Sequence, residues 1–111
     1  MTAKETALLA ANKRAITVPL EVARLSHQVL ELAVDLVNRG NPNSVSDVGV
    51  AGEVAYAGVR GGSLNIYINL PAVDSDQKFI VEVKKEIELI LQKATSLRDK
   101  IFTDCLNIIN R

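Results

Sequence analysis

The sequence predicts an all-α fold, a helical bundle of about four helices with a long C-terminal helix, assembled as an oligomer. Three observations predict this fold. Good helix formers with apolar residues spaced three and four apart fill most of the chain, turn-forming residues divide it at only three places, and the last third contains no helix breaker. The length of 111 residues fits a single domain, residues 1–111.

The first two helices are predicted over residues 2–16 and 19–39. Pro19 separates them, because proline lacks an amide proton and disfavours helix in the residue before it, and Thr17 is the expected N-cap of the second. That helix is amphipathic and ends at Gly40, a residue suited to a left-handed cap. Its expected buried stripe consists of Val22, Leu25, Val29, Leu32, Ala33 and Leu36.

A third helix is predicted after the loop of residues 40–44, where Ser44 and Asp47 form a variant capping box. It contains five glycines between residues 49 and 62, each costing up to about 1 kcal/mol relative to alanine. One of its faces is small in the middle and polar at the ends, so another backbone or a flat ligand could approach closely. This face consists of Asp47, Ala51, Val54, Ala55, Gly58, Gly62, Asn65 and Asn69.

Residues 64–70 alternate between apolar and polar side chains, a period that by itself favours a strand. No partner strand is evident elsewhere in the chain, and a single short strand would be unstable. We therefore predict that the helix continues to Pro71.

The last helix is predicted from Asp76 to Asn110, capped by residues 74–76. At about 50 Å it is long compared with the radius of gyration of about 13 Å for a compact chain of this size. The expected consequence is that it pairs across subunits in a homo-oligomer, a dimer or larger. Its apolar seam consists of Ile80, Val83, Ile87, Ile90, Ala94, Leu97, Ile101, Cys105 and Ile108.

Composition excludes several classes of function. Thirteen basic and thirteen acidic residues, with only four aromatic side chains, predict neither a nucleic-acid nor a membrane partner. A single histidine and a single cysteine leave no expected metal site, so His27 is predicted on the solvated surface and Cys105 in the core. With no apolar run long enough to span a membrane, the expected location is cytoplasmic.

Two segments carry a resemblance. Residues 40–51 read GNPNSVSDVGVA and residues 60–70 read RGGSLNIYINL. In order and spacing, over roughly residues 10–75, the chain resembles the formimidoyltetrahydrofolate cyclodeaminase and methenyltetrahydrofolate cyclohydrolase family. The resemblance implies an all-helical fold, and it places this half-length chain in the C-terminal half of the cyclodeaminase domain.

The family acts on the one-carbon bridge between N5 and N10 of tetrahydrofolate, so the resemblance implies a folate derivative as substrate and no covalent cofactor. A cyclodeaminase, a lyase, expels ammonia after N10 attacks the formimidoyl carbon. A cyclohydrolase adds water to the methenyl bridge. By analogy Asp47 is the group that transfers the proton or orients the reacting group. The side chains expected to bind the substrate are Asn41, Asn43, Ser44, Arg60, Asn65 and Asn69.

Two alternatives stay open. The chain could be a non-catalytic helical module for self-assembly or binding, derived from the family but lacking the first half of the folate pocket. It could instead be a subunit completed by a separate chain that supplies the missing half. Whether the chain is an enzyme is therefore a question for its structure and for assay.

Overall fold

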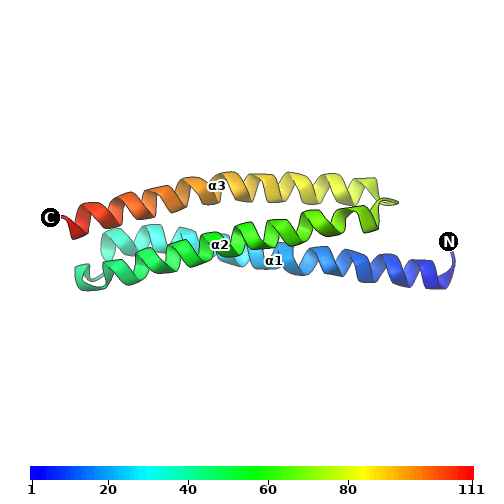
Figure 1. The fold of residues 1–111 in the computed structure, drawn as a ribbon, viewed down its shortest axis with the longest axis horizontal. Coiled ribbons are helices and arrows are strands. Elements are labelled where there is room, and N and C mark those ends of the chain that lie inside the picture. Colours follow the sequence, from blue (N-terminus) through cyan, green and yellow to red (C-terminus); the bar gives the residue numbers. More distant parts are fainter.

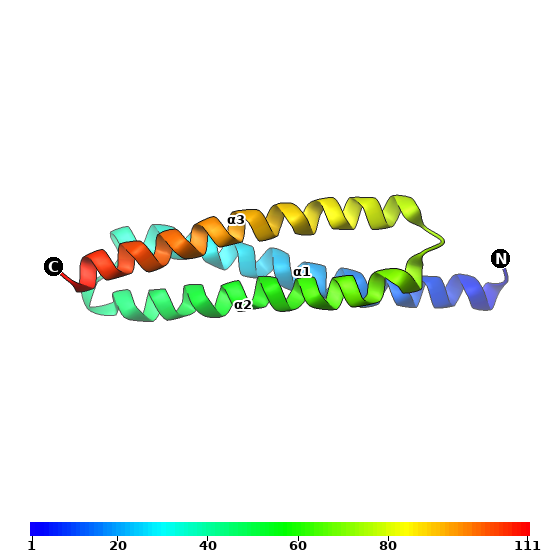
Figure 2. The same ribbon diagram turned by 45° about the horizontal axis from the view of Figure 1, so that its top comes forward.

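The computed structural model describes residues 1–111 as three long helices packed side by side (Figures 1 and 2). Helix α1 spans Ala3–Arg39, α2 spans Val45–Asn69 and α3 spans Gln77–Ile109, with 3₁₀ turns η1 (Pro42–Ser44) and η2 (Leu70–Val73) between them. The molecule is a rod of 64 × 18 × 18 Å. The all-α prediction is confirmed, although the chain has three long helices where about four were expected.

The difference arises at Pro19, which lies inside α1 and does not end it. The predicted N-cap at Thr17 is wrong, because the Thr17 hydroxyl donates to the carbonyl of Arg14 in the previous turn. Proline removes one backbone hydrogen bond and costs about 3 kcal/mol in a helix interior. The flanking side chains of Ile16 and Leu20 are both buried, and their packing offsets that cost.

Two further local predictions at the α1–α2 turn are wrong. Gly40 has φ of −81° and an extended ψ, so it does not adopt the left-handed conformation. Ser44 makes no side-chain capping bond to α2. Asn41 caps the turn instead, because its Oδ1 accepts a hydrogen bond from the backbone N–H of Asn43 at 2.9 Å. The predicted helix is confirmed over residues 64–69, and Leu70 begins the 3₁₀ turn η2. The Asp76 cap on α3 is also confirmed, since its carboxylate accepts from the N–H of Phe79.

The predicted seam of α3 is buried for most of its length. The length of α3 does not require a second subunit, contrary to the prediction, because α1 and α2 of the same chain are long enough to run beside it. The molecule is a rod with a radius of gyration of 17.6 Å, larger than the value of about 13 Å for a compact chain with which the length of the last helix was compared. Cys105 is buried as predicted, and its thiol lies 3.5 Å from the carbonyl of Val45.

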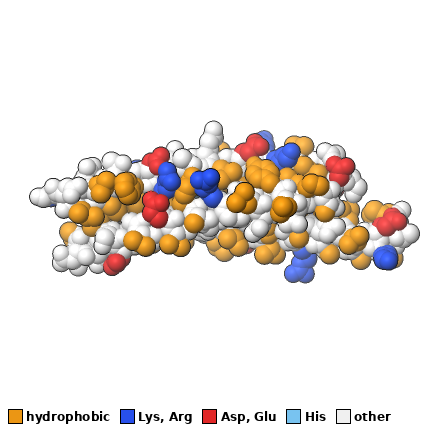
Figure 3. Space-filling model, viewed as in Figure 1, with side chains coloured by type: hydrophobic (Ala, Val, Ile, Leu, Met, Phe, Trp, Pro, Cys, Tyr) orange, Lys and Arg blue, Asp and Glu red, His pale blue; other side chains and the backbone are white.

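Helix α1 has two apolar faces, and the core uses the one that was not predicted. Of the expected stripe only Ala33 is buried, whereas its five larger side chains are 43–63% exposed. The hydrophobic pattern could not decide between the two faces, since each is apolar at helical spacing. The residues of α1 that enter the core are Ile16, Leu20, Ala23, Leu30, Ala33 and Val37. In Figure 3 hydrophobic side chains recur along the visible length of the rod.

The contact between Lys13 and Asp76 predicts how stability depends on pH. The ammonium of Lys13 and the N–H of Phe79 hold the pKa of the Asp76 carboxyl below its ordinary value. A carboxyl whose pKa is lower in the folded state stabilises the fold at pH values above its pKa in the unfolded state. This stabilisation is lost as the pH falls through the pKa of the folded state. Below about pH 4 the melting temperature of the wild type should therefore fall more steeply than that of Asp76→Asn.

Thermal melts between pH 7 and pH 2 measure this difference. Asp99→Asn is the control, because the exposed Asp99 pairs only with the adjacent Arg98. Parallel pH profiles for the wild type and Asp76→Asn would contradict the assignment.

Candidate functional site

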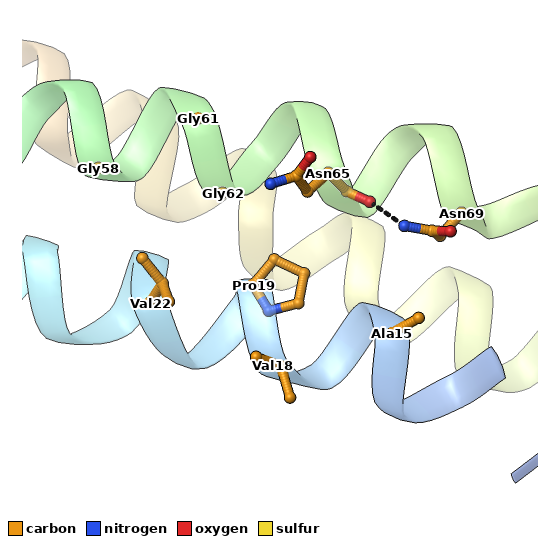
Figure 4. A pocket seen from close by; sticks show the side chains of 9 residues that line it. All are labelled: Ala15, Val18, Pro19, Val22, Gly58, Gly61, Gly62, Asn65 and Asn69. Carbon is orange, nitrogen blue, oxygen red and sulfur yellow. Dashed lines mark hydrogen bonds between the residues drawn. The ribbon is translucent and has the colours of Figure 1, made fainter. Parts of the chain in front are cut away.

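A cleft of about 430 Å³ lies between α1 and α2 near the middle of the rod (Figure 4). Its floor is made of glycines from α2, and the absence of side chains there lets the two helices come close. A Cβ atom on Gly62 would lie 2.8 Å from the carbonyl oxygen of Pro19. The close approach predicted from the glycines is thus confirmed for α1. The cleft is lined by Ala15, Val18, Pro19, Val22, Gly58, Gly61, Gly62, Asn65 and Asn69.

Two of the predicted binding residues, Asn65 and Asn69, lie together in this cleft. The amide nitrogen of Asn69 donates to the backbone carbonyl of Asn65 at 2.7 Å, which fixes the orientation of the Asn69 side chain. The amide group of Asn65 makes no hydrogen bond within the chain, so both its donor and its acceptor are free for a ligand. A flat surface of glycine and valine beside two amides suits a flat polar heterocycle.

Asp47 lines a second cleft farther along the same groove, of about 640 Å³. Gly58 borders both clefts, so they form one continuous groove between α1 and α2. All eight residues of the face predicted on α2 line this groove. Asp47 and Asn65 are nevertheless 18 residues apart on one helix, which corresponds to about 27 Å. Within a single chain, Asp47 and Asn65 therefore do not meet at one reacting atom. The second cleft is lined by Leu25, Ser26, Val29, Asp47, Val50, Ala51, Val54, Ala55 and Gly58.

The other four predicted binding residues lie outside both clefts. Asn41, Asn43 and Ser44 form the exposed η1 turn at the end of the rod, where Asn41 is occupied with capping. The Arg60 guanidinium lies 5.8 Å from the centre of the Tyr56 ring, away from the lining of the groove. Arg98 of α3 lies over the same ring at 4.4 Å. Arg60 therefore contacts a ring that packs against α3, outside the groove.

The α1 side of the cleft was not predicted as part of a site. Ala15, Val18, Pro19 and Val22 form this wall. Pro19 was read as a helix break and Val22 as a core residue, so neither was considered as a ligand contact. The sequence pattern that indicates this wall is the apolar spacing of residues 15, 18 and 22, which continues across Pro19 without interruption.

The remaining reactive side chains do not join the groove. His27 is mostly covered between α1 and α3, with its Nε2 3.7 Å from Glu31, so the prediction of a solvated histidine is wrong. Burial raises the pKa of the Cys105 thiol, which makes it a poor nucleophile. No group of three or more His, Cys, Asp or Glu side chains is placed to hold a metal ion. None of the helices combines the length and the apolar character needed to cross a bilayer.

A family model described as formiminotransferase-cyclodeaminase matches residues 1–89, most of the chain. The chain belongs to the formiminotransferase-cyclodeaminase family. The family resemblance seen in residues 40–51 and 60–70 is thereby confirmed. No solved structure matches the chain.

Individual members of the formiminotransferase-cyclodeaminase family show how much of a relative the chain represents. It is 39% identical over 98 residues to a methenyltetrahydrofolate cyclohydrolase of Methylorubrum extorquens. The aligned residues make up 88% of this chain and 47% of that protein. It is 32% identical over 82 residues to the formimidoyltransferase-cyclodeaminase of Rattus norvegicus, 74% of this chain and 15% of that protein. The same figures hold for the Mus musculus protein. The chain thus spans about half the length of the first relative.

Proposed function

We propose that the chain takes part in one-carbon conversion on tetrahydrofolate, with a methenyltetrahydrofolate cyclohydrolase activity as the first candidate. The observation that carries the proposal is the glycine-floored cleft with Asn65 and Asn69, in a chain whose relatives are named for folate one-carbon reactions. The cyclohydrolase comes first because that relative is more similar and the similarity covers more of the chain.

The proposed roles follow from the chemistry of the groove. The pterin ring lies on the glycine floor against Val18 and Val22, and the amides of Asn65 and Asn69 bind its polar edge. Water adds to the methenyl carbon and gives up a proton to the carboxylate of Asp47 of a second subunit, because Asp47 of the same chain is about 27 Å from Asn65. The bond from that carbon to N5 then breaks, N5 takes up a proton, and the hydroxyl proton leaves as the N10-formyl carbonyl forms. One proton is released overall, because the substrate is a cation.

The experiment is a turnover assay that follows the loss of methenyl absorbance, with ammonia release from formimidoyltetrahydrofolate measured in parallel. The first signal identifies a cyclohydrolase and the second a cyclodeaminase. A folate that binds only the folded chain should also raise its melting temperature. A chain with neither activity, and with no shift in melting temperature, would contradict the proposal and favour a non-catalytic module.

Two amide variants test the cleft. Asn65→Ala and Asn69→Ala each remove a hydrogen-bonding group from the proposed pterin contact, so each should raise KM about tenfold. Asn107→Ala is the matched control, because Asn107 is exposed on α3 and lies outside the groove. Unchanged KM values in both cleft variants would remove the amides from the site.

The proposal extends to self-association. The exposed apolar residues of α1 leave the groove open along one side, and a second subunit is the partner we propose for them.

A further inference from the structure

One polar side chain of the groove between α1 and α2 has no role in the proposed reaction. The residues that line the two clefts of this groove include only four polar side chains. Asp47, Asn65 and Asn69 are the proposed base and the proposed pterin contacts. The fourth is Ser26 of α1, which lines the second cleft together with Gly58, the residue that borders both clefts.

The position of Ser26 is set by the close contact of the two helices. A Cβ atom on Gly58 would lie 2.4 Å from Ser26 Oγ and 3.2 Å from the Cβ of Ser26. The hydroxyl therefore occupies the space directly over Gly58, where any residue other than glycine would place its own side chain. The absence of a side chain at Gly58 is thus what lets the Ser26 hydroxyl lie on the floor of the groove.

The Ser26 hydroxyl is free to bind a ligand. It makes no hydrogen bond within the chain, whereas the hydroxyls of Thr17 and Ser63 each donate to the carbonyl three residues before them. Its side chain is only partly buried. The other residues of α1 that line the clefts are apolar, so Ser26 provides the one side-chain hydrogen-bond donor on this wall.

The distance between Ser26 and the cleft amides suits the substrate. Gly58 precedes Asn65 by seven residues on α2, which corresponds to about 10 Å along the helix axis. In a methenyltetrahydrofolate, the one-carbon bridge and the pyrimidine edge with its amino and keto groups lie at opposite ends of three fused rings. A ring system of this size spans a comparable distance. When Asn65 binds the pyrimidine edge, the bridge therefore lies beside Ser26.

We propose that Ser26 is a catalytic residue whose hydroxyl donates a hydrogen bond to the oxygen that water adds to the one-carbon bridge. This inference rests on the proposed function and gives a role to the remaining polar side chain of the groove. The Ser26 hydroxyl keeps its own proton throughout. The bonds formed and broken, and the protons transferred, are therefore those of the proposed cyclohydrolase reaction.

The strength of this hydrogen bond changes along the reaction. The methenyl substrate has no oxygen on its bridge carbon, so the hydroxyl contributes little to substrate binding. Negative charge develops on the oxygen as the attacking water loses its proton, and again as the hydroxyl proton of the adduct leaves and the bond to N5 breaks. A donor already in place stabilises this charge without reorganisation. Because the interaction is absent from the bound substrate, it raises kcat and leaves KM unchanged.

Steady-state kinetics of Ser26→Ala test this role. Alanine keeps the small size that the α1–α2 contact needs and removes only the hydroxyl. We expect kcat to fall about 10- to 100-fold, with KM for the methenyl substrate within about twofold of the wild type. Ser96→Ala is the matched control, because Ser96 is an exposed serine of α3 that lies outside both clefts. A kcat within about twofold of the wild type in Ser26→Ala would overturn the proposal.

A second variant separates a chemical role of Ser26 from a role in packing. Ser26→Thr keeps the hydroxyl and adds a methyl group, so it should retain more activity than Ser26→Ala although its side chain is larger. If the close contact with Gly58 required only a small side chain, the order of the two variants would be reversed. The reversed order would overturn the proposal. Melting temperatures measured for both variants show whether each is folded.

Equilibrium binding tests the contact without turnover. The product N10-formyltetrahydrofolate carries the added oxygen, whereas tetrahydrofolate has no one-carbon group. At alkaline pH the formyl form is favoured, because its formation releases a proton. Measured by isothermal titration calorimetry, Ser26→Ala should bind the formyl product about five- to tenfold more weakly than the wild type does. Both proteins should bind tetrahydrofolate equally.

The two ligands also distinguish a failure of this inference from a failure of the proposed function. A wild type that binds neither folate contradicts the proposed function, and the role of Ser26 is then overturned with it. A wild type that binds both folates, with the same affinity for the formyl product in Ser26→Ala, overturns the role of Ser26 alone.

Discussion

Asp47→Asn is expected to lower kcat about 10²- to 10⁴-fold while leaving KM within a small factor of the wild type. Asparagine keeps the shape of the side chain, so the groove keeps its size and its glycine floor. It cannot take the proton that water gives up on attack. Only the chemical step loses its base, and for that reason the loss falls on kcat.

The measurement is a set of steady-state parameters for wild type and variant, with circular dichroism to verify the helical content. Asp47 is in the first turn of α2, where a negative charge contributes about 0.3–1 kcal/mol, so a slightly lower melting temperature is expected. Glu53→Gln on the same helix is the matched control, because Glu53 lies outside both groove clefts. A kcat within twofold of the wild type would exclude Asp47 as the base.

Gly62→Ala is expected to lower the free energy of unfolding by about 1–2 kcal/mol, even though alanine is the better helix former. The new methyl would lie 2.8 Å from the carbonyl oxygen of Pro19. That oxygen belongs to the backbone of a continuous helix, so it cannot rotate away as a side chain could. Helices α1 and α2 must separate locally, and the clefts between them lose their shape.

Gly61→Ala is the matched control, one residue away. Its methyl would enter open space in the single chain, so the helix gain of up to about 1 kcal/mol should appear undiminished. Chemical denaturation of both variants measures the two free energies of unfolding. Equal stabilities for the two variants would show that the α1–α2 contact is not limited by position 62.

Periodicity predicted those parts of the fold in which a single face of a helix is apolar. Helix α3 is such a case, because its apolar residues form one seam opposite a charged face, and Asp76 begins it with a hydrogen-bonded cap. Helix α1 is not, because it is apolar on two sides, and the pattern could not tell which side meets the core. Pro19 does not divide the helix as predicted, because the burial of the side chains around it offsets a local free-energy cost of about 3 kcal/mol.

The positions of the candidate side chains could be predicted where the residues are close on one helix. Asn65 and Asn69 are one turn apart, so their shared face implied a shared cleft, and the structure places them there. Asp47 shares that face, yet a common face says nothing about distance along the axis. Arg60 lies over Tyr56, outside the groove. Its position could not be predicted, because a matching sequence motif carries no information about which neighbour a side chain contacts.

The narrowness of the rod also determines how its stability is distributed. Only 22 of the 111 residues are buried, and the cross-section of 18 Å holds a core one side chain deep. Because no wide hydrophobic core connects the two ends of the rod, each position along its axis is stabilised mainly by the contacts between the helices at that position. The first turns of α1, which extend past the turn between α2 and α3, have the fewest neighbours and open most readily (Figure 2).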